Sequence, residues 1–321
     1  MRQTIVVTGA AGFIGSGVVK ELNDRGYEQL VLIDRLGQGI KWKNLVGKKY
    51  DLFLHKDEGL AWMSQHADEI KAVIHMGACS ATTEMDADYL MKNNTRYSQE
   101  IAKMALEHGW RFIYASSAAT YGDGSLGFQD DESQLEGLHP LNMYGYSKHA
   151  FDLWLKRHHL LDRFVGLKFF NVFGPNEWHK GRMSSHVLKM VDQVKEGSIR
   201  LFKSNHPDYV NGGQMRDFIY VKDVARMVCD LLETTHAGLY NLGLGRAHSW
   251  NELAEATIEA MSMKAKIEYI DMPQDLIGQY QNYTCATMDK WKRTSLELPR
   301  WSLKEAVRDY VQQHLLLKQT W

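Results

Sequence analysis

The chain has 321 residues, enough for two lobes or for one large α/β unit with a smaller attached lobe. Its 44% hydrophobic and 24% charged residues are ordinary for a globular protein and exclude long disorder, fibrous repeats and a disulfide-rich miniature. The formal net charge is -1, so no overall basic field attracts nucleic acid or an anionic membrane, and we expect neither as a partner. An anionic ligand therefore needs a local site.

The cysteines of the chain are Cys79, Cys229 and Cys285. Their odd number and wide spacing fit neither a disulfide framework nor a zinc ligand set, so we expect a reducing compartment and no metal site. The sequence opens without the pattern of a signal peptide, and no run of ~18 apolar residues occurs in it. We therefore expect a cytoplasmic protein.

Short apolar runs alternate with helical patterns through the first half of the chain. Residues 4–8 are a β-branched run that stops at Gly9, as in a buried parallel strand, and residues 13–26 carry apolar side chains at helical spacing. The further strand candidates are 30–34, 51–54, 72–75, 112–116 and 164–170, and the further helix candidates are 88–108 and 146–159. This alternation predicts an α/β fold with a doubly wound parallel sheet of the Rossmann type and right-handed crossovers.

After about residue 172 the elements become shorter and polar loops separate them. We expect a smaller C-terminal α/β domain there that binds substrate. Residues 218–243 still read as strand, helix and strand, which predicts that the chain returns to the large sheet. The predicted domains are therefore residues 1–170 with 218–243, and residues 171–217 with 244–321, packed around one cleft.

Three glycines, Gly9, Gly12 and Gly15, mark the junction between the first strand and the first helix. The first permits a tight turn, the second lets the backbone approach a pyrophosphate, and the third lets the helix pack closely on the sheet. The helix N-terminus adds free N–H groups. Glycines at such a turn can serve packing alone. However, Asp34 ends the second strand 19 positions after Gly15, close to the ~20 expected for a residue that hydrogen-bonds the adenosine ribose. Together these features predict a dinucleotide site.

The identity of the nicotinamide cofactor depends on three side chains. Asp34 favours a free ribose 2′-hydroxyl and hence NAD, whereas Arg35 and Lys41 can pair with the 2′-phosphate of NADP. Arg35 can equally be a solvated surface charge. The residues alone leave both cofactors open.

Tyr144 and Lys148 are four positions apart, which places them on one face of a helix. A neighbouring ammonium lowers the pKa of a phenol from ~10 toward neutrality, so the pair predicts a proton acceptor for an alcohol that is being oxidised. Such a pair also occurs by chance in structural helices. However, Ser116 and Ser117 end a strand at the carboxyl edge of the sheet, where ligands of open α/β folds bind, and a hydroxyl there can hydrogen-bond the reacting oxygen.

The glycine turn, the serine at a strand end and the Tyr–Lys pair follow one another as in the short-chain dehydrogenase/reductase superfamily, which the chain resembles. Residues 215–225 are similar to the R-D-F-x-Y-V-x-D-V-A signature of its extended, nucleotide-sugar branch, and residues 168–175 to R-x-x-N-x-x-G-P, with Lys168 in the usual Arg place. Within this branch the chain resembles, over nearly its whole length, the family of ADP-L-glycero-D-manno-heptose 6-epimerases. The most specific stretches are 75–84, 114–122, 140–148 and 179–181.

The resemblance implies an isomerase of lipopolysaccharide core heptose biosynthesis that inverts C6 of ADP-glycero-manno-heptose by transient oxidation and reduction with tightly bound NADP. It also implies a homo-oligomer, in many members a pentamer. The implied roles are proton transfer by Tyr144 on one face of the sugar and by Lys180 on the other, with Ser117 at the catalytic serine position and Lys148 orienting the nicotinamide ribose. A solvated surface lysine is the alternative for Lys180.

The same match implies which residues line the two ligands. The cofactor residues are Gly9, Ala10, Ala11, Gly12, Phe13, Ile14, Gly15, Asp34, Arg35, Lys41, Lys56, Met76, Gly77, Ala78, Cys79, Ser80, Asn93, Tyr144, Lys148, Val172 and Lys180. The substrate residues are Ser117, Asn171, Arg182, Phe202, Arg216 and Tyr280. Physically, Arg216 offers a two-pronged donor for a diphosphate and Asn171 a neutral hydrogen-bonding group. The alternative role of Arg216 is an ion pair with Asp217 or Asp223, and that of Asn171 is a structural role in a turn.

Several positions depart from the family pattern. Arg182 stands where the family usually has Ser, Met76 replaces an acidic residue, Arg35 occupies a place often filled by Asn, and residues 205–215 form a longer segment than expected. Arg182 and the long segment leave another nucleotide-sugar epimerase, such as a 4-epimerase, or a reductase as the alternative function.

Two other classes are disfavoured. Ala118 and Ala119 stand where a dehydratase needs an acidic pair, which argues against dehydration. A dinucleotide-binding regulator without activity is expected to lack the Ser, Tyr and Lys set, which this chain has.

Overall fold

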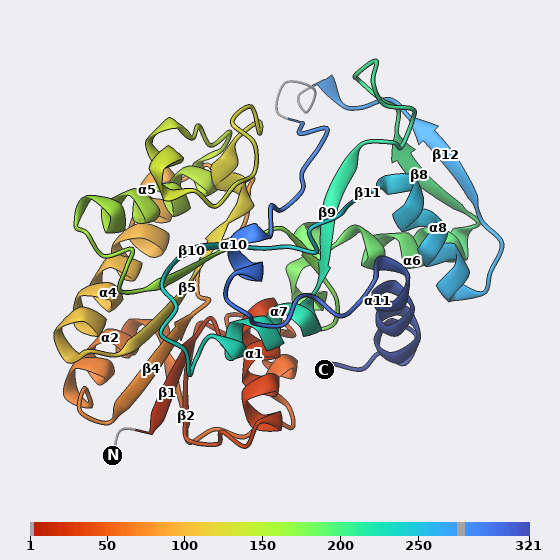
Figure 1. Cartoon of the computed structure of the whole chain (residues 1–321). Coiled ribbons are helices and arrows are strands. Elements are labelled where there is room, and N and C mark those ends of the chain that lie inside the picture. The colour runs from red at the N-terminus through yellow and green to blue at the C-terminus, as the bar shows by residue number, and fades with distance from the viewer. Residues whose placement is uncertain (1–2, 275–279) are drawn as a thin grey trace.

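The computed structural model describes residues 3–274 and 280–321 and has two lobes (Figure 1). A seven-stranded parallel sheet forms the first lobe, in the strand order β10-β6-β5-β4-β1-β2-β3. Its strands are β1 (Thr4–Thr8), β2 (Leu30–Asp34), β3 (Leu52–His55), β4 (Ile70–His75), β5 (Arg111–Ser117), β6 (Val165–Phe169) and β10 (Gly238–Leu242). No helix within the described residues is long and apolar enough to cross a membrane.

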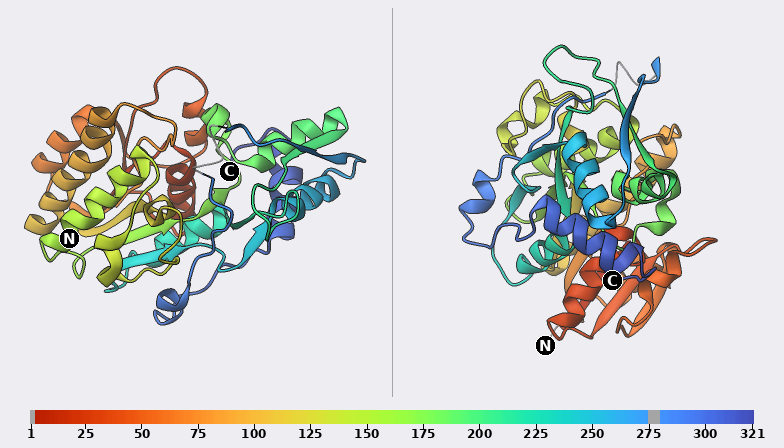
Figure 2. Two further views of the ribbon diagram at one scale, coloured as in Figure 1. Left: turned by 90° about the horizontal axis from the view of Figure 1, so that it is seen from above. Right: turned by 90° about the vertical axis from the view of Figure 1, so that its right-hand side faces the viewer.

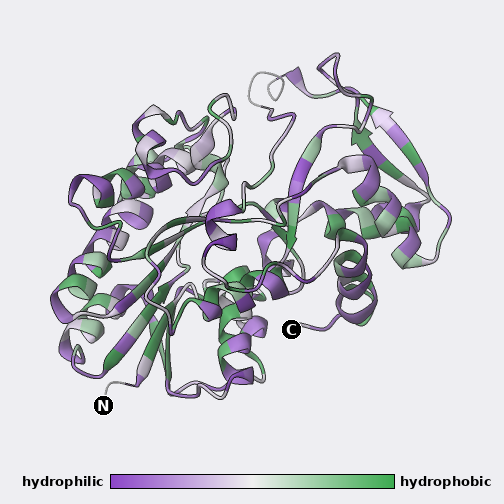
Figure 3. Cartoon of the chain, viewed as in Figure 1, coloured by the Kyte–Doolittle hydropathy of each residue, from purple (hydrophilic) through white to green (hydrophobic). Residues whose placement is uncertain are grey.

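Helices cover both faces of this sheet (Figure 2). One face carries α1 (Phe13–Asp24) and α7 (Val221–Asp230), which pack against each other; the other carries α2 (Lys56–Gln65), α4 (Tyr97–His108) and α5 (Met143–Arg157). The strands β2, β6 and β10 are buried along their whole length, because a parallel sheet with helices on both sides has no solvent face. Their hydrophobic residues stand out between the helices in Figure 3. The predicted doubly wound sheet is therefore confirmed.

The second lobe has its own hydrophobic core around Phe173, Val191, Leu253 and Val307. Its strands are β7 (Asn171–Phe173), β8 (Ser198–Phe202), β9 (Met215–Tyr220), β11 (Ala247–Ser249) and β12 (Lys266–Ile270). They form a three-stranded sheet, β11-β9-β7, and a two-stranded sheet, β12-β8. Its helices are α6 (His186–Glu196), α8 (Trp250–Met261) and α11 (Leu303–Asp309). Short helices and turns complete the chain: η1 (Lys41–Leu45), α3 (Ala87–Leu90), η2 (Met91–Arg96), η3 (Ala118–Tyr121), η4 (Glu132–Gly137), η5 (Trp178–Met183), α10 (Asp289–Lys292) and η6 (Tyr310–Leu315).

The segment 218–243 is shared between the sheets. Its last strand, β10, pairs in parallel with β6 in the large sheet, and its helix α7 packs on α1. Its first strand, β9, pairs instead with β7 and β11. The division into residues 1–170 with 218–243 and residues 171–217 with 244–321 stays a prediction.

Candidate active site

The glycine turn follows β1 and packs against the backbone at Gly77, just after the neighbouring strand β4. Gly9 has a φ of +65°, and a Cβ atom there would lie 2.6 Å from the Cα of Gly77, so both the conformation and the space require glycine. A Cβ on Gly15 would lie 2.1 Å from the carbonyl oxygen of Gly9. Helix α1 begins directly after the turn with no side-chain cap, so its first N–H groups are available to an anion. This cradle fits a dinucleotide pyrophosphate.

The carboxylate of Asp34 is already engaged by protein donors. Its Oδ2 accepts from the backbone N–H of Ala11 at 2.8 Å, and its Oδ1 accepts from the N–H of Arg35 at 2.6 Å and from Lys41 Nζ at 2.5 Å. Asp34 thus stabilises the glycine turn through Ala11, and it also lines the cavities beside the turn.

A cavity of about 260 Å³ adjoins Asp34. Arg35, Lys41, Lys56, Cys79 and Asn93 line it. Lys56 Nζ donates to Asn93 Oδ1 at 2.8 Å, which holds this lysine at the cavity wall. Three cationic side chains and the single carboxylate of Asp34 surround this space, so its net positive charge suits an anion.

A second cavity, of about 690 Å³, lies between the lobes and runs from the glycine turn to Arg216. It brings together most residues that the sequence assigned to a ligand. They are Gly9, Gly12, Phe13, Ile14, Gly15, Asp34, Lys41, Met76, Gly77, Ala78, Ser80, Ser117, Tyr144, Lys148, Asn171, Val172, Lys180, Arg182, Arg216 and Tyr280.

Three assigned residues do not line either cavity. Ala10 and Ala11 are fully buried within the turn, and the N–H and the carbonyl of Ala11 are bonded to Asp34 and Asn44. The ring of Phe202 instead packs edge-on against the ring of Tyr280, with centroids 6.4 Å apart. Phe202 thus supports a residue that lines the cleft.

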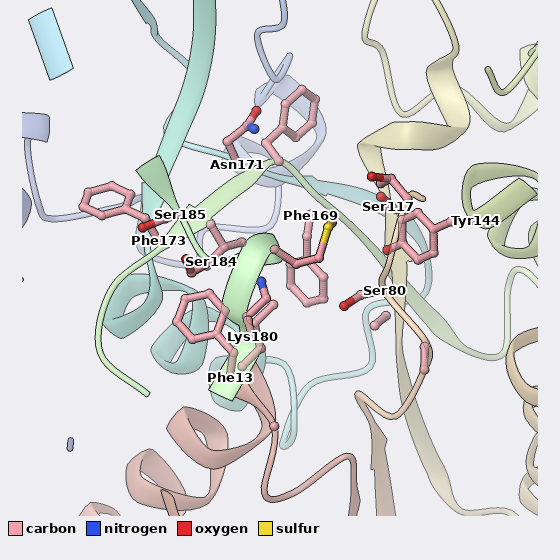
Figure 4. Close-up of a pocket in the computed structure, with 18 of the residues that line it drawn as sticks. Phe13, Ser80, Ser117, Tyr144, Phe169, Asn171, Phe173, Lys180, Ser184 and Ser185 are labelled. Carbon is pink, nitrogen blue, oxygen red and sulfur yellow. The ribbon is translucent and has the colours of Figure 1, made fainter. Parts of the chain in front are cut away.

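Tyr144 lies in the first turn of α5, next to Ser117 at the end of β5 (Figure 4). The helix starts three residues earlier than predicted because Asn142 caps it: its Oδ1 accepts from the N–H of Gly145 at 2.9 Å. Burial raises the pKa of Tyr144, and the Ser117 hydroxyl opposes this shift by hydrogen bonding. The phenol and the hydroxyl therefore form one polar corner of the cleft.

Lys148 lies one helical turn further along, 4% exposed, and its Nζ donates to the carbonyl of Ala115 at 2.7 Å. Burial lowers the pKa of Lys148 to about 8, while Asp152 raises it in part. The prediction that Lys148 lowers the pKa of Tyr144 is wrong: burial of the phenol dominates, and the ammonium is held by the β5 backbone. The prediction that both side chains share one helix face is confirmed.

Lys180 reaches the cleft from the opposite wall, on η5 (Figure 4). Its backbone N–H donates to the carbonyl of Glu177 at 2.9 Å, and its Nζ lies 4.9 Å from the ring centre of Phe13. Burial lowers the pKa of Lys180, while the carboxylate of Glu177 raises it in part. Lys180 is half-buried, so the alternative of a solvated surface lysine does not hold.

Arg216 closes the far end of the cleft between two aromatic rings. Its guanidinium lies 5.0 Å from the ring centre of Tyr280 and 5.8 Å from that of Trp250, and Trp250 Nε1 donates to the Tyr280 hydroxyl at 2.9 Å. The guanidinium donates to the backbone carbonyl of the preceding residue, Met215. In the part of the chain that the structure describes, it forms no ion pair with Asp217 or Asp223. The planar donor is therefore positioned for an anion.

Sequence reasoning missed several side chains that line the cleft. His179, Ser184, Ser185 and Lys189 flank Lys180 along the chain, and their proximity to that lysine was the available signal. Trp250 stands apart from every motif, and only the tertiary structure brings it beside Arg216.

Comparisons with known proteins agree with this geometry. Residues 5–243 match the model of the NAD dependent epimerase/dehydratase family. An ADP-L-glycero-D-manno-heptose-6-epimerase of Nitratidesulfovibrio vulgaris is 52% identical over 315 residues, which cover 97% of each chain, and one of Fusobacterium nucleatum is 45% identical over 97% of this chain and 98% of its own. The crystal structure of the Helicobacter pylori enzyme of that name superposes with a TM-score of 0.81 at 26% identity, covering 97% of this chain and 96% of that one. The cleft between a nicotinamide-binding sheet and a second lobe is thus that of an isomerase, and the chain belongs to the NAD dependent epimerase/dehydratase family and, within it, to the ADP-L-glycero-D-manno-heptose-6-epimerases.

Proposed function

We propose that this chain interconverts ADP-D-glycero-β-D-manno-heptose and ADP-L-glycero-β-D-manno-heptose by inverting C6. The observation that carries the proposal is that Tyr144 and Lys180 reach one cleft from opposite walls. A single proton-transfer group serves one face of a sugar carbon, so inversion benefits from a second group on the other side. The names of the relatives support the choice of sugar.

Each proposed role follows from the position of the side chain. Tyr144 and Lys180 exchange a proton with the sugar hydroxyl oxygen in the two orientations of the carbon, and Ser117 hydrogen-bonds that oxygen. Lys148, fixed to the Ala115 carbonyl, orients the nicotinamide ribose. When bound at the glycine turn, the nicotinamide cofactor supplies reversible oxidation of the sugar carbon, with no net redox change. Arg216 holds the substrate diphosphate.

The environments of Tyr144 and Lys180 fit a shared task. Burial raises the pKa of the phenol and lowers the pKa of the amine, which brings Lys180 closer to the neutral form that accepts a proton. The two shifts therefore run in opposite directions, toward a phenol that donates a proton and an amine that accepts one.

We propose NADP as the cofactor. Both oxygens of Asp34 already accept hydrogen bonds from protein groups, which leaves less capacity for a ribose hydroxyl. Arg35, Lys41 and Lys56 surround the adjoining cavity and favour a 2′-phosphate. Denaturing the purified protein and identifying the released nucleotide tests this directly. Release of NAD would show that Asp34 dominates the choice.

The decisive test of the reaction uses purified protein, bound NADP⁺ and ADP-D-glycero-β-D-manno-heptose. We expect NMR to show conversion to a mixture of the two C6 epimers. No conversion with the nucleotide bound would refute the proposal. A parallel incubation with UDP-glucose addresses the 4-epimerase alternative, for which UDP-galactose would be the product.

The resemblance supports a homo-oligomer, and we propose that the protein associates with copies of itself. Sedimentation velocity on the purified protein measures this. A single species of 36.9 kDa at micromolar concentration would refute it.

A further inference from the structure

A buried amide joins the cofactor turn to the segment that carries Lys180. Asn44 lies in η1 and is 4% exposed. Its Nδ2 donates to the carbonyl of Ala11 at 3.0 Å and to the carbonyl of Asn176 at 2.9 Å, and it lies 3.3 Å from His179 Nδ1. We call residues 176–183, the segment that carries Lys180, the strap. The side chain of Asn44 therefore contacts both the glycine turn and the strap.

An amide is needed at this position because its NH2 group supplies two hydrogen-bond donors. Two backbone carbonyls converge on Nδ2, and each needs an N–H. These two bonds use both hydrogens of Nδ2, so His179 Nδ1, at 3.3 Å, is only a close neighbour of the amide. Burial lowers the pKa of His179 to about 4, so its ring is neutral and adds no charge beside Asn44. A carboxylate of the same shape would present only acceptors to these groups.

Ala11, which Asn44 bonds in the glycine turn, also forms a hydrogen bond with Asp34. The carbonyl of Ala11 accepts from Asn44, and the N–H of the same residue donates to Asp34 Oδ2 at 2.8 Å. Ala11 is fully buried. Asn44 and Asp34 thus fix the two peptide groups on either side of the Ala11 Cα between them.

The strap is fastened at its first residue by a second set of bonds. Asn176 has a φ of +75°, a conformation that few residues other than glycine adopt readily. Its Nδ2 donates to Ser16 Oγ at 3.0 Å and to the carbonyl of Trp321 at 2.9 Å, and its Oδ1 accepts from the N–H of Trp321 at 2.8 Å. Lys180 follows in the same strap, with its Nζ 4.9 Å from the ring centre of Phe13 at the start of α1.

We propose that Asn44 is a positioning residue that fastens the strap onto the cofactor turn, so that retention of the nucleotide and the placement of Lys180 depend on the same side chain. The role of Lys180 in this statement rests on the proposed function. The fastening itself rests on the contacts of Asn44 and is independent of which sugar is bound.

The test compares Asn44→Asp, which keeps the shape and removes the donors, with the parent protein. Asn23→Ala is the matched control: Asn23 Nδ2 also donates to two backbone carbonyls, those of Tyr27 and Lys49, but it lies outside the cleft. Hydrogen exchange followed by mass spectrometry reports the opening of the strap, and absorbance after denaturation reports the NADP⁺ that a loaded sample retains through dialysis.

For Asn44→Asp we expect peptides spanning 176–185 to exchange about tenfold faster or more, with β4 and β5 unchanged, and NADP⁺ to be lost several-fold faster. Asn23→Ala should match the parent in both measurements. Unchanged exchange of the strap in a folded Asn44→Asp protein would overturn the proposal.

Should Asn44→Asp fail to fold, Asn44→Ala carries the test, because alanine removes both donations to the Ala11 and Asn176 carbonyls without burying a charge. Faster exchange over 177–185 is expected there too, and unchanged exchange overturns the proposal. These readouts need no sugar substrate, so an inactive parent protein would contradict the proposed function while leaving the fastening measurable.

Discussion

Replacing Lys148 by Met should make the protein more stable at neutral pH while removing its activity. Lys148 is 4% exposed, and burial lowers its pKa from 10.5 to about 8. In the unfolded chain this lysine binds its proton more tightly, so the folded protein bears a penalty below pH 8 that disappears as the pH rises toward 10.5. At ~1.36 kcal/mol per pKa unit the penalty is about 3 kcal/mol at pH 7.

Methionine keeps the apolar stem and removes the charge. The variant also loses the hydrogen bond to the Ala115 carbonyl, which is worth about 1 kcal/mol. We therefore expect Lys148→Met to unfold with a free energy about 2 kcal/mol higher than the parent at pH 7, and the difference to vanish near pH 10. A catalytic site commonly trades stability for function in this way.

Urea denaturation of nucleotide-stripped protein at pH 7, 8, 9 and 10 measures the difference. Other titrating groups are common to both proteins and cancel. Lys156→Met on the same helix is the control: Lys156 pairs with Glu136 and donates to the carbonyl of Glu132, so its loss should lower the stability by about 1 kcal/mol, the opposite sign to Lys148→Met. A Lys148→Met protein that is less stable than the parent at pH 7, or a difference that does not vary with pH, would refute the argument.

Three further outcomes are expected. Tyr144→Phe should slow turnover at least ~100-fold in the NMR assay, with Tyr146→Phe, exposed on the same helix, near the parent rate. Asp152→Asn should cost about 3–5 kcal/mol of unfolding free energy in urea, because it strands the buried ammonium of Lys168, 2.9 Å away, and adding Lys168→Met should recover part of that loss. Arg216→Ala should raise the KM for the ADP-sugar at least ~10-fold without altering NADP⁺ retention, because a charge-assisted bond to the diphosphate is lost; an unchanged KM would remove Arg216 from the substrate site.

The large sheet could be predicted from the sequence because its strands are continuous apolar runs. Residues 30–34 were predicted to the residue, since Leu30–Asp34 is buried throughout and bounded by polar loops. The helix predicted at 146 begins at Met143, and the capping residue Asn142 was the overlooked signal. The helix predicted at 88–108 is interrupted by the π-helical turn η2, Met91–Arg96, where the Asn94 side chain hydrogen-bonds the backbone of Cys79. That interruption follows from a tertiary contact and has no local signature.

The partner of β9 is a second feature that local sequence does not specify. The strand Met215–Tyr220 has no sequence feature that selects its partner, and it pairs with β7 and β11. Ser117 and Tyr144 could be located from the sequence, because they lie at a strand end and in the first turn of a helix. Asn44 could not, since its role comes from carbonyls at positions 11 and 176 that only the fold brings together.

The near-neutral net charge conceals a strong separation of charge in the folded chain. Among the described residues, no carboxylate lies within 4.0 Å of the cationic groups of Lys148, Lys180, Arg182, Lys189 or Arg216, all of which line one cleft. Asp34 on the cavity wall pairs with Lys41, and other acidic side chains pair outside the cleft, as Asp152 does with Lys168. Lys148 and Arg216 are buried, and burying an unpaired cation costs stability that a bound anion offsets. The cleft therefore has the charge required for two diphosphates, one from the dinucleotide and one from the substrate, although the chain as a whole has almost none.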